Sequence, residues 1–82
     1  MNSIDTVKRI LIDVLNLGIA GQTMNAESHL LGAYAELDSI AVISLISRLE
    51  EHFGFDVEDD EINGQVFETL GTLSTFVNSK LI

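Results

Sequence analysis

The sequence contains no cysteine and no proline, and only four Lys or Arg residues among 82. Without cysteine it has no disulfide, no thiolate metal site and no thiol nucleophile of its own. Its thirteen Asp and Glu residues give a formal charge of −9. Such a surface repels nucleic acid and attracts proteins that carry Lys and Arg. We therefore expect basic protein partners and no nucleic acid partner.

Long hydrophobic runs are missing too. No apolar stretch reaches the ~18–20 residues that cross a bilayer, and residues 1–5 lack the basic segment of a signal peptide. These absences predict a cytoplasmic protein without membrane insertion. At 46% apolar residues the chain is too hydrophobic for a disordered tail. Its length suits one small domain over residues 1–82.

Apolar residues recur with helical spacing near the start of the chain. Residues 4–17 predict an amphipathic helix, in which Ser3 supplies the N-terminal cap and Gly18 the left-handed stop. A loop over residues 18–37 follows, with four apolar side chains as expected anchors. These are Leu30, Leu31, Tyr34 and Leu37.

A second helix is expected over residues 39–53, with Asp38 as its cap and Gly54 as its stop. Its apolar stripe predicts buried side chains on one face, whereas Ile40 and Ile43 project to the flank where water is expected. The stripe consists of Val42, Leu45, Ile46, Leu49 and Phe53.

After the charge run 56–61, a short helix is expected around Val66 and Phe67. A last helix runs from Gly71 on, with Thr69 as cap and Lys80 near its negative end. No alternating β-branched pattern predicts a strand. The fold class is therefore all-α: a four-helix bundle of three principal helices and one short helix, with a long loop between the first two.

Residues for catalysis or metal binding are poorly represented. There is no Ser-His-Asp order with a glycine elbow and no phosphate-cradling loop, so we predict no enzyme activity. His29 and His52 are expected to face solvent. A calcium loop starting at Asp59 fails at its twelfth position, where Leu70 replaces the required Glu, so no metal site is predicted.

One constellation carries chemical information. Residues 36–40 read Glu-Leu-Asp-Ser-Ile and lead into residues 49–54, Leu-Glu-Glu-His-Phe-Gly. Together they resemble the signature of acyl carrier proteins, and residues 67–73 resemble that family's junction before the last helix. The resemblance covers essentially the whole chain. It implies a carrier of the acyl carrier bundle type, with 4'-phosphopantetheine transferred from coenzyme A to Ser39 and acyl groups held as thioesters.

The resemblance also implies partners, namely a phosphopantetheinyl transferase and acyl ligases, synthases or transferases with basic docking patches. The carrier itself is expected to be a monomer. We expect apolar contact from Ile40 and Ile43, and charge from Asp38, Glu50 and Glu51.

Two other readings share the fold. A peptidyl or aminoacyl carrier has the same arm, but residues 36–39 favour the acyl type over the Gly-Gly-x-Ser style. An adaptor would keep the bundle and leave Ser39 unmodified. A calcium-responsive module is the third alternative. Because Ala41, Ser44, Ser47 and Arg48 replace the acids usual after the modified serine of carriers in fatty-acid synthesis, we expect a specialised biosynthetic pathway.

Overall fold

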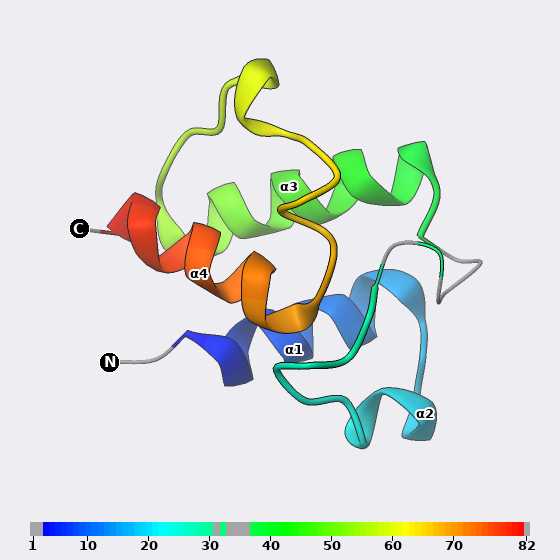
Figure 1. Ribbon diagram of the computed structural model, residues 1–82. Helices are drawn as coiled ribbons and strands as arrows, with labels where there is room; N and C mark the ends of the chain where they lie inside the picture. Colours follow the sequence, from blue (N-terminus) through cyan, green and yellow to red (C-terminus); the bar gives the residue numbers. More distant parts are fainter. Residues whose placement is uncertain (1–2, 31, 33–36, 82) are drawn as a thin grey trace.

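The structure is a computed structural model that describes residues 3–30, 32 and 37–81. Over these residues it is helical and contains no strand, apart from an isolated bridge between His29 and Thr69. Figure 1 shows the long helices crossing around one interior. No described helix is long and apolar enough to cross a membrane. The elements are α1 (Ile4–Leu15), α2 (Ile19–Gln22), α3 (Ser39–Phe53), η1 (Asp59–Glu61, a 3-10 turn) and α4 (Leu70–Leu81).

The all-α class with three principal helices is confirmed, but the short helix expected around Val66 and Phe67 is not. Residues 64–67 form turns instead, and the acidic run supplies one 3-10 turn at η1. The short helix that the structure does contain, α2, lies in the long loop. Four residues are too few for a stable amphipathic pattern, so local periodicity could not place this turn.

Both caps predicted for α1 are wrong. The Ser3 hydroxyl donates to Asn78 Oδ1 at 2.6 Å and so joins the start of α1 to α4 instead of capping its own helix. Asn16, not Gly18, takes the left-handed conformation that ends α1, at φ 55° and ψ 46°. Asparagine tolerates this conformation because its short polar side chain can bond locally.

The caps of α3 and α4 are confirmed. The Asp38 carboxylate accepts a hydrogen bond from the Ala41 amide at 2.8 Å, and Gly54 ends α3 at φ 75°. The Thr69 hydroxyl accepts from the Thr72 amide at 3.1 Å at the start of α4. Because each of these caps involves residues within four positions of one another, the sequence pattern was sufficient to place them.

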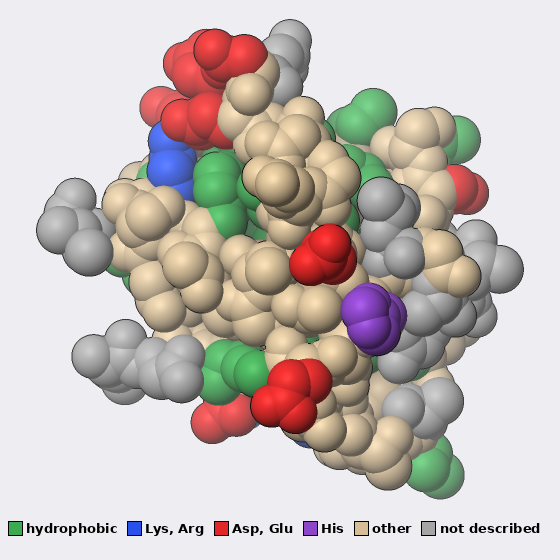
Figure 2. Space-filling view, viewed as in Figure 1, with side chains coloured by type: hydrophobic (Ala, Val, Ile, Leu, Met, Phe, Trp, Pro, Cys, Tyr) green, Lys and Arg blue, Asp and Glu red, His purple; other side chains and the backbone are tan. Residues whose placement is uncertain are grey.

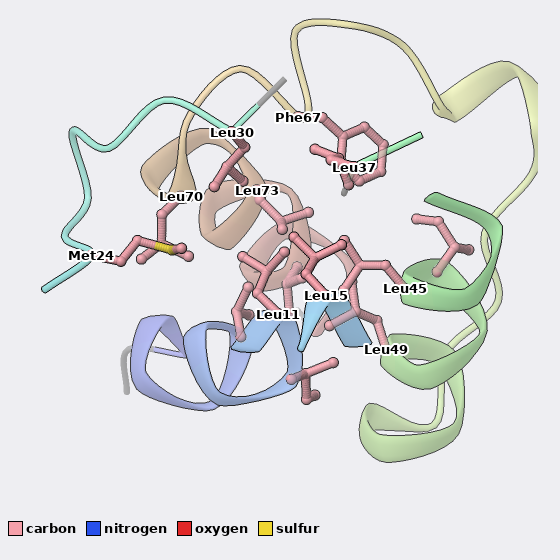
Figure 3. Close-up of a cluster of buried hydrophobic side chains, with 14 residues drawn as sticks. Leu11, Leu15, Met24, Leu30, Leu37, Leu45, Leu49, Phe67, Leu70 and Leu73 are labelled. Carbon is pink, nitrogen blue, oxygen red and sulfur yellow. The ribbon is translucent and has the colours of Figure 1, made fainter. Parts of the chain in front are cut away.

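The core lies where α1 meets α3 and α4. Leu11, Leu45 and Leu49 are fully buried in it, and Figure 3 shows them beside the α4 side chain Leu73. Each buried leucine stabilises the fold by ~1.5–3 kcal/mol. The predicted loop anchors Leu30 and Leu37 are also buried, whereas Leu31 and Tyr34 lie outside the described residues.

Backbone hydrogen bonds tie the long loop to the start of α4. The Leu30 amide donates to the Glu68 carbonyl at 2.9 Å, and the Gly71 amide donates to the Ala26 carbonyl at 2.8 Å. A Cβ atom at position 71 would lie 2.7 Å from that carbonyl oxygen, closer than a carbon can approach. Glycine at position 71 therefore permits the loop to cross directly over the helix start.

Ser74 places an unpaired hydroxyl in the core. It is 4% exposed, and its Oγ has no hydrogen-bond partner among the described residues. Since an unsatisfied buried hydroxyl costs free energy and alanine is the better helix former, we expect Ser74→Ala to raise the free energy of unfolding by about 1 kcal/mol. Urea denaturation measures this. Ser79→Ala is the control, because its exposed hydroxyl donates to the Phe76 carbonyl; a destabilised Ser74→Ala would contradict the prediction.

Candidate functional site

Ser39 is the first residue of α3, and its side chain is exposed. Its hydroxyl makes no hydrogen bond to any described residue. Of the first amides of the helix, that of Ala41 is held by Asp38, and that of Val42 bonds the Asp38 carbonyl at 2.9 Å. Within the described part of the chain, the amides of Ser39 and Ile40 have no partner. An accessible hydroxyl thus lies beside two amides that are unpaired among the described residues.

This position has a defined electrostatic character. The N-terminus of a helix carries about half a positive elementary charge from its aligned peptide dipoles, so it stabilises a nearby anion. The Asp38 carboxylate accepts from the Ala41 amide in this first turn. A singly charged group bonded to the Ser39 oxygen would be stabilised there, on a helix that the core holds in place.

The predicted partner face is only partly assembled. Ile40 is 74% exposed and Ile43 is 66% exposed, as the sequence predicted. Glu51 is exposed as well, more than two turns beyond Ile43 along α3. Asp38 is exposed but its carboxylate serves as the cap. The structure therefore gathers Ser39 and the two isoleucines at one end of α3.

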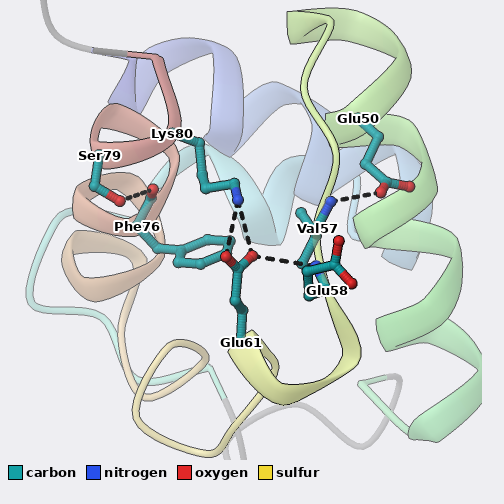
Figure 4. A network of polar contacts seen from close by, with 7 residues as sticks. All are labelled: Glu50, Val57, Glu58, Glu61, Phe76, Ser79 and Lys80. Carbon is teal, nitrogen blue, oxygen red and sulfur yellow. Dashed lines mark hydrogen bonds and ion pairs between the residues drawn. The ribbon is translucent and has the colours of Figure 1, made fainter.

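Glu50 has an internal partner. It is half-buried, and its Oε2 accepts a hydrogen bond from the Val57 amide at 2.8 Å, which Figure 4 shows. This bond fastens the segment after α3 back onto the helix. A role for Glu50 in partner contact stays a prediction, and such a contact would compete with this bond.

His29 and His52 are both exposed, as predicted. Among the residues whose placement the structure gives, no group of three or more His, Asp or Glu side chains could hold a metal ion.

One side chain of the acidic run is engaged in an ion pair. Lys80, in the last turn of α4, donates to both carboxylate oxygens of Glu61 at 2.9 Å (Figure 4). The hydrogen bond from Lys80, aided by the Glu58 amide, lowers the pKa of Glu61 below its ordinary value. The sequence placed Lys80 near the negative end of the last helix but did not indicate this pair, because its residues are 19 positions apart.

The lowered pKa of Glu61 predicts a pH effect. A carboxyl group whose pKa is lower when folded stabilises the fold above its unfolded pKa, about 4.3, and loses that contribution as the pH falls through the folded value. We expect Glu61→Gln to be less stable than wild type at neutral pH, with the difference shrinking below about pH 4.3. Urea denaturation over this range measures it. Glu27→Gln, an exposed charge-matched change, is the control; a difference independent of pH would disprove the role of the pair.

Arg48 also has a tertiary partner that the sequence did not indicate. Its guanidinium lies 2.8 Å from the Asp13 carboxylate and bridges α3 to α1. The two residues are 35 positions apart, so no helical spacing relates them. Both side chains are exposed, and an exposed ion pair contributes only ~0–1 kcal/mol to the stability of the fold. The main consequence is that the guanidinium of Arg48 already has an acidic partner within the protein.

Comparison with known proteins identifies the family. The phosphopantetheine attachment site family matches residues 5–77. The solution NMR structure of a holo acyl carrier protein from Nitrosomonas europaea superposes with a TM-score of 0.91 at 54% sequence identity, covering 99% of this chain and 98% of that one. The chain belongs to the acyl carrier protein family. An acyl carrier protein is a carrier and not an enzyme, and its cofactor is a covalently attached 4'-phosphopantetheine.

Proposed function

We propose that Ser39 is the attachment residue and that this acyl carrier protein, a single domain over residues 1–82, carries acyl groups as thioesters on the arm. The observation that carries the assignment is the exposed Ser39 hydroxyl at the start of α3, with no partner among the described residues. The other six serines are less suited. Ser3 and Ser74 are buried, Ser28 and Ser79 are hydrogen-bonded, and Ser44 and Ser47 lie away from the start of a helix.

The surroundings of Ser39 fit a phosphodiester. The positive end of α3, where the amides of residues 39 and 40 have no partner among the described residues, would stabilise one negative charge on the serine oxygen. Asp38 holds the first turn in place through the Ala41 amide, so that the hydroxyl is presented on a rigid element. When attached, the arm supplies the thiol that this cysteine-free chain lacks.

The cargo is proposed to be acyl. Residues 36–39 favour this type over a peptidyl or aminoacyl carrier, and the relative that shares 54% of its residues is named a holo acyl carrier protein. The unusual residues after Ser39 support a specialised biosynthetic pathway. We propose a cytoplasmic monomer, loaded by a phosphopantetheinyl transferase and served by acyl ligases, synthases or transferases, whose basic groups are attracted by the acidic run 56–61.

Intact-mass spectrometry tests the proposal. The purified protein is incubated with coenzyme A and a broad-specificity phosphopantetheinyl transferase, and fragmentation then locates the modification. We expect a gain of one phosphopantetheine on the peptide that contains Ser39. A wild-type protein that several transferases leave unmodified would instead support the unmodified adaptor, which keeps the bundle and works by binding alone.

A further inference from the structure

A groove of about 390 Å³ lies between α1 and α3. Its lining is mostly apolar and includes the buried side chain of Ile10. Four exposed polar side chains border it, namely Arg9 and Asp13 of α1 and Arg48 and His52 of α3. The groove therefore offers room for an apolar group with two guanidinium groups beside it.

The groove carries one positive charge that the protein does not compensate. Arg48 is paired with Asp13, and that carboxylate is the only one in the described lining. Arg9 makes no hydrogen bond or ion pair to any described residue. The adjoining hollows contain one acid each, Asp5 and Glu51, but neither bonds Arg9. An unpaired Arg is unexpected in a chain whose thirteen acids outnumber its four Lys and Arg residues.

The remaining basic side chains are engaged within the protein. Lys80 is paired with Glu61, and the Lys8 ammonium donates to the Gln22 carbonyl at 2.9 Å. In the view of Figure 2, acidic side chains appear at several places, and Lys or Arg is prominent only beside the acidic cluster at the upper left. Arg9 is therefore the basic side chain that is left to bind a carboxylate from outside.

The groove lies on the flank of α3 away from the proposed attachment residue. Arg48 follows Ser39 by nine residues, which at about 3.6 residues per turn places the two side chains about half a turn apart around the helix. The groove also lies toward the C-terminal end of α3, whereas Ser39 begins the helix. An occupant of the groove would therefore leave the Ser39 hydroxyl accessible.

We propose that this groove binds a protein partner through an Asp or Glu side chain next to an apolar one, while the arm on Ser39 stays free for its enzymes. The carboxylate pairs with Arg9 and brings the groove to neutrality, and the apolar side chain is buried against its lining. A second copy of this chain fits less well, because two molecules of formal charge −9 repel each other. Binding at the groove does not depend on attachment at Ser39.

An NMR titration of the isotope-labelled protein tests this surface with two synthetic peptides, acetyl-Leu-Glu-Leu-amide and the neutral acetyl-Leu-Gln-Leu-amide. We expect the acidic peptide to shift the amide signals of residues 6–13 and 48–52, and the neutral peptide to bind more weakly. Arg9→Gln is expected to lower the affinity for the acidic peptide about twofold to fivefold, because one exposed ion pair is lost. Circular dichroism verifies that the variant is folded.

Lys8→Gln is the matched control. Lys8 carries the same charge one residue away on α1 but does not line the groove. Equal losses for the two variants would show general attraction to a basic side chain and would overturn the inference. Equal binding of the neutral peptide, or the absence of shifts at the groove, would also overturn it. A dimer in size-exclusion chromatography that Arg9→Gln dissociates would assign the groove to a second copy instead.

A second measurement tests whether the groove and Ser39 are independent. Phosphopantetheine transfer from coenzyme A is expected to proceed at an unchanged rate when the acidic peptide saturates the protein. Inhibition that Arg9→Gln relieves would show that the occupant blocks the transferase and would overturn the separation of the two surfaces. A protein that is never modified, with or without peptide, would refute attachment at Ser39 and leave the binding result standing.

Discussion

Replacing Ser39 by alanine is expected to abolish the gain in mass on incubation with coenzyme A and a phosphopantetheinyl transferase. The phosphodiester needs the serine oxygen, and alanine has no nucleophile to offer. The side chain is exposed and makes no hydrogen bond to a described residue, so its removal should leave the fold intact. The capping bond from Asp38 to the Ala41 amide does not involve the replaced atom.

The matched control for this experiment lies on the same helix. Ser47 is exposed and belongs to α3, but it sits in the body of the helix, where the amides are already bonded. Ser47→Ala is therefore expected to keep the full mass gain. If Ser39→Ala still gained one phosphopantetheine, the attachment residue would have to be another hydroxyl, and the proposal for Ser39 would be wrong.

Truncating Leu45 to alanine is expected to cost about 3 kcal/mol of the free energy of unfolding, since a fully buried leucine leaves a cavity as well as losing its burial. A domain of this size has a net stability of only ~4–12 kcal/mol, so a large share would be lost. The effect should reach function, because Leu45 anchors the helix that presents Ser39. Chemical denaturation followed by circular dichroism measures the change.

Leu81→Ala is the control for this prediction. Leu81 is 47% exposed at the end of α4, so the same truncation there should cost less than about 1 kcal/mol. Equal losses at the two positions would show that the core between α1 and α3 is not where the stability of the bundle lies.

The site and the core are connected through α3. One face of this helix buries Leu45, Ile46 and Leu49, and the other exposes Ile40 and Ile43 close to Ser39. Asp38 and Gly54 close its two ends. Ser39 is therefore presented by a helix whose opposite face is packed in the core.

The pattern of the sequence was sufficient for α3. Its bounds, Ser39–Phe53, agree with the prediction, because the cap, the apolar stripe and the glycine stop are all local signals within one helix. The exposure of Ile40 and Ile43 followed from the same helical spacing. The residues that resemble the carrier signature around Ser39 are consecutive, so the sequence alone suggests attachment there, which stays a prediction.

Tertiary structure alone decided the partners of the polar side chains. The bonds of Ser3 to Asn78, Lys80 to Glu61 and Arg48 to Asp13 join residues far apart in the chain, and no periodic pattern relates them. The bond from Val57 to Glu50 spans seven residues across the end of a helix. A contact between Glu50 and a partner would have to compete with this bond. Local chemistry determined where the helices begin and which faces they bury, whereas the packing of those faces determined which charges remained free for a partner.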